Sequence, residues 1–232
     1  MMEDRCSSRS VPDAIYYQQS RGIRLLGGIS LRARTAIYRL FMKVMCPSPE
    51  ASVLDVGVSL DTAPLEANVL EQLYPFRDRL TCAGIGDGAA FKQAYPGVSF
   101  IRIAPHERLP FADKQFDIGY SNAVLEHTGS RIEQRAFVSE LCRVAHRVFL
   151  VVPNRLFPIE HHTGVPFLHY LPMWLFRFCL RKTPYCYWAE ERHLNPFFAR
   201  DVRALFNGVA DPHICYAGLG VSIFKSNLVV IL

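Results

Sequence analysis

The stretch VLDVGVSLD, Val53 to Asp61, decides which fold this 232-residue chain adopts. Val53, Leu54 and Val56 form a short apolar run, which is typical of a strand buried on both faces of a parallel sheet. The run carries one acid, Asp55, and ends at Gly57, where the missing Cβ lets the backbone approach another group closely. The carboxyl ends of parallel strands face the crevice in which ligands bind. The stretch therefore predicts a central strand followed by a ligand loop.

Predicted strands and helices alternate around this stretch. Further strands are expected at residues 80–85, 98–103, 116–122 and 147–154. Helices are expected at residues 31–45, 64–74, 89–95 and 130–145. A helix at 197–206 and two strands, near 213–216 and 221–232, close the chain. This order predicts an α/β fold: a doubly wound, mostly parallel, seven-stranded Rossmann-like sheet with an antiparallel terminal strand.

The chain divides into a basic arm and one larger domain. Residues 1–46 form the arm, which we expect to be irregular to about residue 30 and helical after it. Its first 45 residues hold eight basic and three acidic side chains and so account for the whole net charge of +5. Such an arm is either a solvated helix face or a contact for an anionic surface such as phospholipid head groups or nucleic acid. Residues 47–232 form the domain, with residues 155–195 as an insertion.

The cysteines and the N-terminus indicate the compartment. Seven cysteines form no CxxC pair, which favours a reducing environment. The opening MMEDRCSSRS has no apolar signal core. We therefore expect a cytoplasmic protein, with peripheral contact to the inner face of the membrane as an open alternative. No nucleic-acid partner is expected, because no stripe of aromatic and basic residues appears.

Four segments resemble the class I S-adenosylmethionine-dependent methyltransferases, in particular their type 11 group. These are VLDVG (53–57), LTCAGIGD (80–87), ERLPFADKQFDIGYSNAVLEH (107–127) and RVFLVVPN (147–154). The third is the most specific, because LPF, a short turn, FD, a strand and LEH rarely occur together. A fifth segment, PNRLFPIEHHTGVPFLHYLP (153–172), resembles methyltransferases associated with bacterial surface polysaccharides and lipid-linked glycans.

The resemblance implies a methyltransferase domain over residues 47–232 and S-adenosylmethionine as its cofactor. It implies methyl transfer to an oxygen of a small or glycan-like acceptor that is lipid-linked in one alternative. The implied cofactor contacts are Asp55, Val56, Gly57, Ser59, Ile85, Gly86, Asp87, His106, Glu107, Leu109, Asn122 and Ala123.

Three positions depart from the family pattern. Ser59 stands where the family has a second glycine, and Gly86 stands where an acid accepts the ribose hydroxyls. Pro105 replaces an acid that accepts from the adenine amino group. These departures keep one alternative open: a non-catalytic binding or scaffold protein of the same fold with a degraded cofactor site.

A hydroxyl acceptor needs a group that takes its proton, and histidine suits this role near neutral pH. His127 follows the predicted fourth strand, and His161 and His162 follow the fifth, so these three are the catalytic candidates. A helix-start histidine bonded to backbone is the competing interpretation of His127. We predict no metal site, because adjacent residues point in different directions and no spaced further ligand is evident. Glu126 is expected to cap the following helix, with orientation of the cofactor loop as the alternative.

The segment LHYLPMWLFRFCL, residues 168–180, is unusually aromatic for a connection. One interpretation is a lid whose apolar side packs on the sheet domain and closes an acceptor pocket. The other is an interfacial element with Tyr170 and Trp174 at the level of lipid head groups and Arg177 and Arg181 outside.

Overall fold

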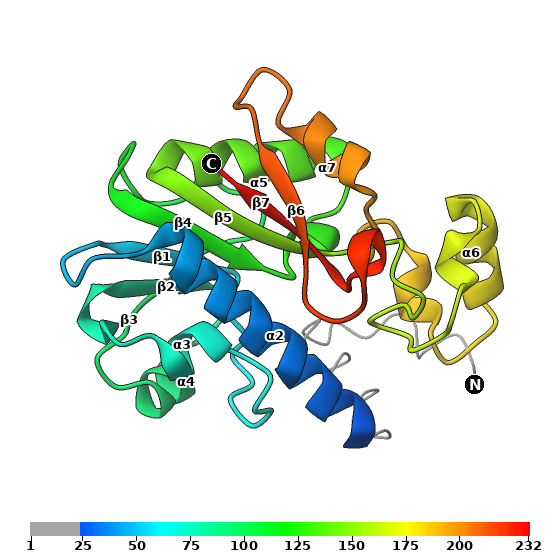
Figure 1. Cartoon of the computed structure of the whole chain (residues 1–232), viewed down its shortest axis with the longest axis horizontal. Coiled ribbons are helices and arrows are strands. Elements are labelled where there is room, and N and C mark those ends of the chain that lie inside the picture. The colour runs from blue at the N-terminus through cyan, green and yellow to red at the C-terminus, as the bar shows by residue number, and fades with distance from the viewer. Residues whose placement is uncertain (1–23) are drawn as a thin grey trace.

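A seven-stranded sheet forms the centre of the computed structural model, which describes residues 24–232 except the side chains of residues 24–27 and 29 (Figure 1). Its strands are β1 (Val53–Val56), β2 (Leu80–Gly84), β3 (Ser99–Arg102), β4 (Phe116–Asn122), β5 (Ala145–Pro153), β6 (His213–Ala217) and β7 (Asn227–Ile231). The strand order is β3-β2-β1-β4-β5-β7-β6. Strands β1 to β5 are parallel, and β7 runs antiparallel to both β5 and β6. The predicted fold class is confirmed.

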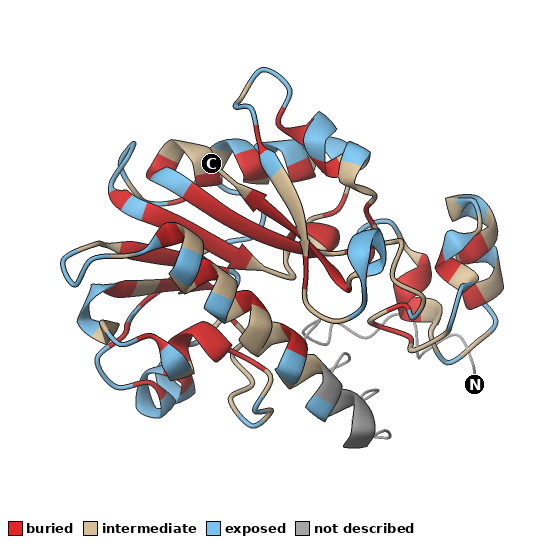
Figure 2. Ribbon diagram, viewed as in Figure 1, coloured by how far each residue is buried: buried red, intermediate tan, exposed pale blue. Residues whose placement is uncertain are grey.

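Helices cover both faces of the sheet, and alternate residues of each strand serve the two layers. The helices are α2 (Arg24–Met45), α3 (Val69–Leu73), α4 (Ala89–Ala94), α5 (Arg131–Val144), α6 (Met173–Leu180) and α7 (Ala199–Leu205). Val53 packs in the layer that contains side chains of α2, α3 and α4. Leu54 and Val56 pack in the layer that contains α5 and α7. Asp55, two residues after Val53, therefore points to the side of α2 and α3. Figure 2 shows the strands buried between these helical layers.

Helix α2 begins earlier than predicted. The expected irregular stretch to residue 30 is wrong for residues 24–30, where the helix continues through Gly27 and Gly28; the part over residues 1–23 lies outside the described residues. Ile37, Phe41 and Met45, spaced four residues apart, are fully or almost fully buried on the sheet. The ring of Phe41 packs edge-on against Tyr120 and Phe149, with centroids 5.2 and 5.4 Å apart. These contacts fix the helix across the sheet.

One helix start and one helix cap differ from the sequence-based expectation. Helix α3 begins at Val69 and not near Pro64, because Asn68 adopts a left-handed conformation (φ 50°) and uses its side chain to hold another loop. Helix α5 starts at a capping box, in which Ser130 accepts from the Glu133 N–H and Glu133 accepts from the Ser130 N–H. Ser130 therefore fills the capping role predicted for Glu126, and that prediction is wrong.

The insertion 155–195 has a small core of its own. This core contains the buried side chains of Phe176, Leu180, Tyr187, Trp188 and Leu194. The Asn195 N–H donates to the Glu126 carbonyl at 2.9 Å and ties the end of the insertion to the loop after β4. The outer side of α6 faces solvent (Figure 2): the side chains of Trp174 and Phe178 are 71% and 60% exposed. None of the helices among the described residues combines the length and apolarity needed to cross a membrane.

Candidate active site

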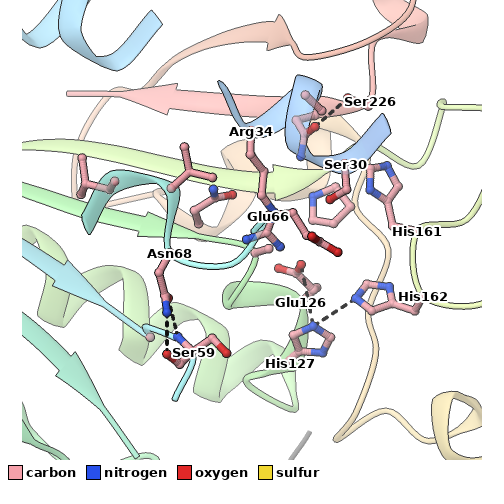
Figure 3. Close-up of a pocket in the computed structure, with 18 of the residues that line it drawn as sticks. Ser30, Arg34, Ser59, Glu66, Asn68, Glu126, His127, His161, His162 and Ser226 are labelled. Carbon is pink, nitrogen blue, oxygen red and sulfur yellow. Dashed lines mark hydrogen bonds and ion pairs between the residues drawn. The ribbon is translucent and has the colours of Figure 1, made fainter. Parts of the chain in front are cut away.

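A cavity of about 210 Å³ lies at the carboxyl ends of β1 and β4, where the strand order reverses (Figure 3). Helix α2, the loop after β1, the start of α3, the end of β4 and the insertion all contribute to its wall. Its acidic and basic lining residues are Arg34, Asp55, Glu66, Glu71, Glu126, His127, Glu160, His161 and His162. Such a switch point is where open α/β sheets bind ligands.

Two acids form the wall of this cavity next to β1. Asp55 is 6% exposed and Glu71, from α3, is 1% exposed. Burial and the neighbouring Glu71 raise the pKa of Asp55 well above its usual range. The Cys82 thiol donates to one Glu71 oxygen at 3.2 Å, while the other makes no hydrogen bond to any described residue. Two buried acids side by side favour a cationic ligand.

Arg34 brings a positive charge into the same cavity. It projects from α2, and in Figure 3 its guanidinium group reaches toward the middle of the cavity, near Glu66. Its charge lowers the pKa of Asp55, although burial and Glu71 outweigh it. The cavity therefore combines buried acids with one guanidinium, which suits a ligand that carries charges of both signs.

The conformation of the loop after β1 is fixed mainly by contacts with other residues of the protein. Gly57 has φ 96°, and a Cβ there would overlap the Val124 side chain. Glycine is therefore needed at position 57 to make room for the Val124 side chain, in addition to any room that a ligand needs. The Ser59 N–H donates to the Asn68 side chain at 3.0 Å, and Asn68 donates back to the Ser59 carbonyl at 2.8 Å. The Ser59 N–H is consequently engaged within the fold.

The structure brings only part of the predicted cofactor set into the cavity. Asp55, Gly57, Ser59, Asn122 and Ala123 line it. Val56 and Leu109 lie in the core on the α5 side of the sheet.

The other predicted residues lie outside the cavity, near the end of β2 and after β3. Ile85 is 55% exposed, Gly86 has φ 115°, and Glu107 is exposed. The Asp87 carboxylate accepts from the Ala89 N–H at 3.1 Å, at the start of α4. Nδ1 of His106 lies 3.5 Å from Oε1 of Glu133. The end of β2 therefore presents no buried acid for a ribose.

Three side chains meet at the opposite end of the cavity, and we call Glu126, His127 and His162 the histidine centre (Figure 3). The Nε2 atoms of His127 and His162 lie 3.1 Å apart, and the two rings are nearly perpendicular, at 87°. Oε1 of Glu126 is 3.9 Å from Nε2 of His127. Glu126 is fully buried, and neither carboxylate oxygen makes a hydrogen bond to a described residue. Its carboxylate therefore faces the His127 ring without a hydrogen bond to it.

The hydrogen bonds at the other ring nitrogens fix both tautomers. Nδ1 of His127 lies 2.6 Å from the His193 carbonyl, and Nδ1 of His162 lies 2.7 Å from Oε1 of Glu160. Both partners are acceptors, so both Nδ1 atoms carry hydrogen. In the neutral rings the two Nε2 atoms then hold lone pairs that face each other. A proton or another cation has to lie between them.

The pKa values of the titratable groups in and around the histidine centre are shifted in different directions. Burial lowers the pKa of His127 to about 3 and raises that of Glu126 to about 7. Burial alone would raise the pKa of Glu160, but His162 and the N–H groups that Glu160 accepts from lower it to about 2. The neighbouring His161 is also buried, which lowers its pKa to about 4, and its Nε2 has no hydrogen-bond partner among the described residues.

Several residues of the cavity carried no recognisable signal in the sequence. Arg34 belongs to the basic arm, Glu71 sits in a short helix, and Trp188 lies late in the insertion. The Trp188 ring packs against His127 and His162, with centroids 5.7 and 4.8 Å away. These positions are up to 154 residues apart and meet only in the folded chain. The helical pattern marked Arg34 merely as a polar residue.

Comparisons with known proteins find similarity to methyltransferases over part of the sequence and in the fold. Residues 60–148 match the type 11 family model described as a methyltransferase domain. A search of curated protein sequences finds no match.

Many solved structures share the fold. PigF bound to S-adenosylhomocysteine has a TM-score of 0.59 at 12% identity; the match covers 97% of this chain but only 62% of PigF. An S-adenosylmethionine-dependent methyltransferase from Aquifex aeolicus has a TM-score of 0.54 at 14% identity, covering 96% and 98% of the two chains. Magnesium protoporphyrin IX methyltransferase from Synechocystis with bound S-adenosylhomocysteine has a TM-score of 0.51 at 14% identity, covering 99% and 90%.

Proposed function

We propose that this chain, which is a class I S-adenosylmethionine-dependent methyltransferase, methylates a hydroxyl oxygen of a glycan-like acceptor. The observation that carries the proposal is the continuity of one cavity from Asp55 to the histidine centre. A cofactor at the strand ends and an acceptor beside the insertion would thus share one enclosed space. When bound, S-adenosylmethionine supplies an electrophilic methyl group.

The charges of the cavity fit this cofactor. Its amino acid part carries an ammonium and a carboxylate, and its sulfur is cationic. We propose that Asp55 and Glu71 hold the cationic part and that Arg34 binds the carboxylate. The burial of both acids and a Glu71 oxygen without a hydrogen bond to a described residue are the observations that support this fit. The alternative of a scaffold with a degraded cofactor site rests on Gly86 and Pro105, which belong to the adenosine end.

The part of the cavity beside the insertion, where we place the acceptor, suits a hydroxyl group. The chain has to orient the acceptor oxygen, exclude water and provide for the loss of the hydroxyl proton. We propose that the histidine centre binds this hydroxyl, since His127 and His162 face the cavity from two elements, and that Trp188 fixes their rings. His161 stays a candidate for binding the acceptor, because its Nε2 is buried without a partner among the described residues.

The outer surface of the insertion supports an acceptor carried on a lipid. Phe167, Tyr170, Trp174 and Phe178 are 39% to 71% exposed. No acid occurs from residue 161 to residue 189, and Arg181 and Lys182 are exposed at the end of α6. Aromatic residues beside basic ones suit the head-group region of an anionic membrane. We propose peripheral contact of this surface with the membrane that carries the acceptor.

A methyl-donor assay tests the proposed reaction. Labelled S-adenosylmethionine is incubated with soluble sugars, sugar nucleotides and lipid-linked glycans, and products are separated and treated with base. We expect label in a glycan as a base-stable methyl ether, with faster transfer to the lipid-linked form. Transfer to nitrogen, or to a carboxylate as a base-labile ester, would contradict the proposed oxygen acceptor.

A further inference from the structure

The histidine centre has the composition of a metal site, although the sequence indicated none. We propose that Glu126, His127 and His162 bind one divalent transition-metal ion of the Zn²⁺ type, with a coordination position open to the cavity. The three ligand atoms lie within 4.8 Å of one another. Two imidazoles and one carboxylate are a ligand set that holds catalytic Zn²⁺ and related ions.

The two imidazoles already have the mutual geometry of metal ligands. Nitrogens bound to one Zn²⁺ at about 2.0–2.1 Å lie about 3.3 Å apart in a tetrahedral site. The observed Nε2–Nε2 distance is 3.1 Å, with the rings at 87° to each other. A cation between them would remove the conflict between two facing lone pairs.

The third ligand is a buried carboxyl group that lacks a hydrogen bond. Glu126 is fully buried, and no hydrogen bond from a described residue reaches its carboxylate. Leaving such a group without a partner is costly, and an ion is one of the few ways to satisfy it. Its Oε1 lies 3.9 Å from Nε2 of His127, so a modest turn of the unbonded carboxylate completes the set.

The surroundings of the centre match those of known metal sites. A metal-bound histidine usually donates its second ring N–H to a carboxylate or a backbone carbonyl, which orients the ring. Here His162 donates to Glu160 and His127 donates to the His193 carbonyl. Glu160 is held in turn by the N–H groups of His162 and Thr163, at 3.0 and 2.7 Å. The insertion thus supplies one ligand and both orienting groups.

The role of the ion rests on the proposed function, whereas its binding does not. In the open coordination position the ion would hold and polarise the acceptor hydroxyl. The competing explanation of the short Nε2–Nε2 contact is a proton shared by the two rings, with no metal affinity.

Titration with Co²⁺ tests the site in the full-length protein, stripped with a chelator and without cofactor or acceptor. We expect one bound Co²⁺ per chain, with visible ligand-field absorption and no thiolate-to-cobalt band. His127→Gln and His162→Gln should each weaken binding at least about tenfold, and Glu160→Gln about 10–100-fold. His161→Gln, which removes the adjacent imidazole, is the matched control and should retain the affinity of the wild type.

Each outcome decides between a metal site and a shared proton. The proposal is overturned if the wild type binds no more Co²⁺ than the double variant His127→Gln/His162→Gln, or if His161→Gln weakens binding equally. S-adenosylhomocysteine affinity and the circular dichroism spectrum, measured on the same samples, show whether each variant is folded. Cofactor binding without Co²⁺ binding rejects the metal site and leaves the proposed methyl transfer intact.

Discussion

Asp55 shows how a single buried acid links cofactor binding to stability. It sits at the end of β1, beside Glu71, and its pKa is raised mainly by burial. Ionising it inside the folded chain costs free energy, which a bound cation offsets. In the proposed cofactor site, Asp55 would therefore serve the ligand at the expense of the unliganded fold.

We predict that Asp55→Asn stabilises the unliganded protein near neutral pH and weakens S-adenosylhomocysteine binding. The folded-state pKa of Asp55 lies above its unfolded value, so the wild type loses stability as pH rises through the folded pKa. Asp55→Asn does not lose this stability. Its gain in unfolding free energy is about 1.4 kcal/mol per unit of the Asp55 pKa shift and should fade as the pH falls to about 4. Thermal unfolding at several pH values, with Asp61→Asn from the same loop as control, measures this. A gain independent of pH would contradict the account.

Arg34 gives the second prediction at this scale. Arg34→Gln should raise the dissociation constant of S-adenosylhomocysteine about 10–100-fold, because a hydrogen bond to a charged group contributes about 1.5–3 kcal/mol. Arg32, exposed on the same helix, is the matched control, and Arg32→Gln should leave this dissociation constant unchanged. Calorimetry measures both. Adenosine, which lacks the carboxylate, should bind the wild type and Arg34→Gln equally; a loss for adenosine as well would argue against a carboxylate contact.

Individual site residues were only partly predictable from the sequence. Asp55 and Gly57 follow from the strand end that carries them. His127 and His162 were named separately, but their contact depends on how a 41-residue insertion folds back over β4. Gly57 also shows the limit of local reasoning: its Cβ would overlap Val124, so a bulky substitution there disturbs the fold and does not isolate cofactor binding.

Among the elements, α2 couples the core to the proposed cofactor site. Its buried face packs on the sheet while Arg34 lines the cavity. We predict that Phe41→Ala costs about 3–5 kcal/mol of unfolding free energy, since the ring is fully buried between aromatic neighbours. Denaturant unfolding measures this, and Phe41→Leu should cost clearly less. A loss below about 1 kcal/mol would show that α2 does not pack as described.

The insertion gives a prediction about membranes. Trp174→Ser combined with Phe178→Ser should reduce sedimentation with anionic phospholipid vesicles severalfold and leave S-adenosylhomocysteine affinity unchanged. The reason is that these side chains face solvent and lie outside the cavity. Ile132→Ser, which removes a side chain 83% exposed on α5, is the control and should not alter vesicle binding. Equal sedimentation of wild type and double variant would remove the support for membrane contact.

The elements themselves were largely predictable, because hydrophobic periodicity and helix signals are local. The strands and their alternation with helices follow from short apolar runs and turn residues. The predicted element bounds are wrong where a side-chain contact overrides the local sequence pattern. At Asn68, the side chain bonds to the Ser59 backbone and ends the turn before α3. The lid interpretation of residues 168–180 stays a prediction: Trp188, later in the insertion, lines the cavity, whereas Trp174 faces solvent.

For the whole molecule, the strand order places two dissimilar halves of a site in one cavity. The half beside β1 is acidic and receives Arg34 from the N-terminal helix, and the other half is the histidine centre under the insertion. The adenosine end, by contrast, lacks the acid usual for ribose, so affinity should depend mainly on the amino acid part of the cofactor. This distribution could not be predicted from sequence, because it arises from elements that are distant along the chain.

The most direct test of the account is an experimental structure of the protein with S-adenosylhomocysteine. We expect the amino acid part of the ligand between Asp55 and Arg34, with its sulfur directed toward the histidine centre. Density for the ligand elsewhere on the surface, or a cavity filled by the protein's own side chains at saturating ligand, would contradict the central claim that cofactor and acceptor meet in this cavity.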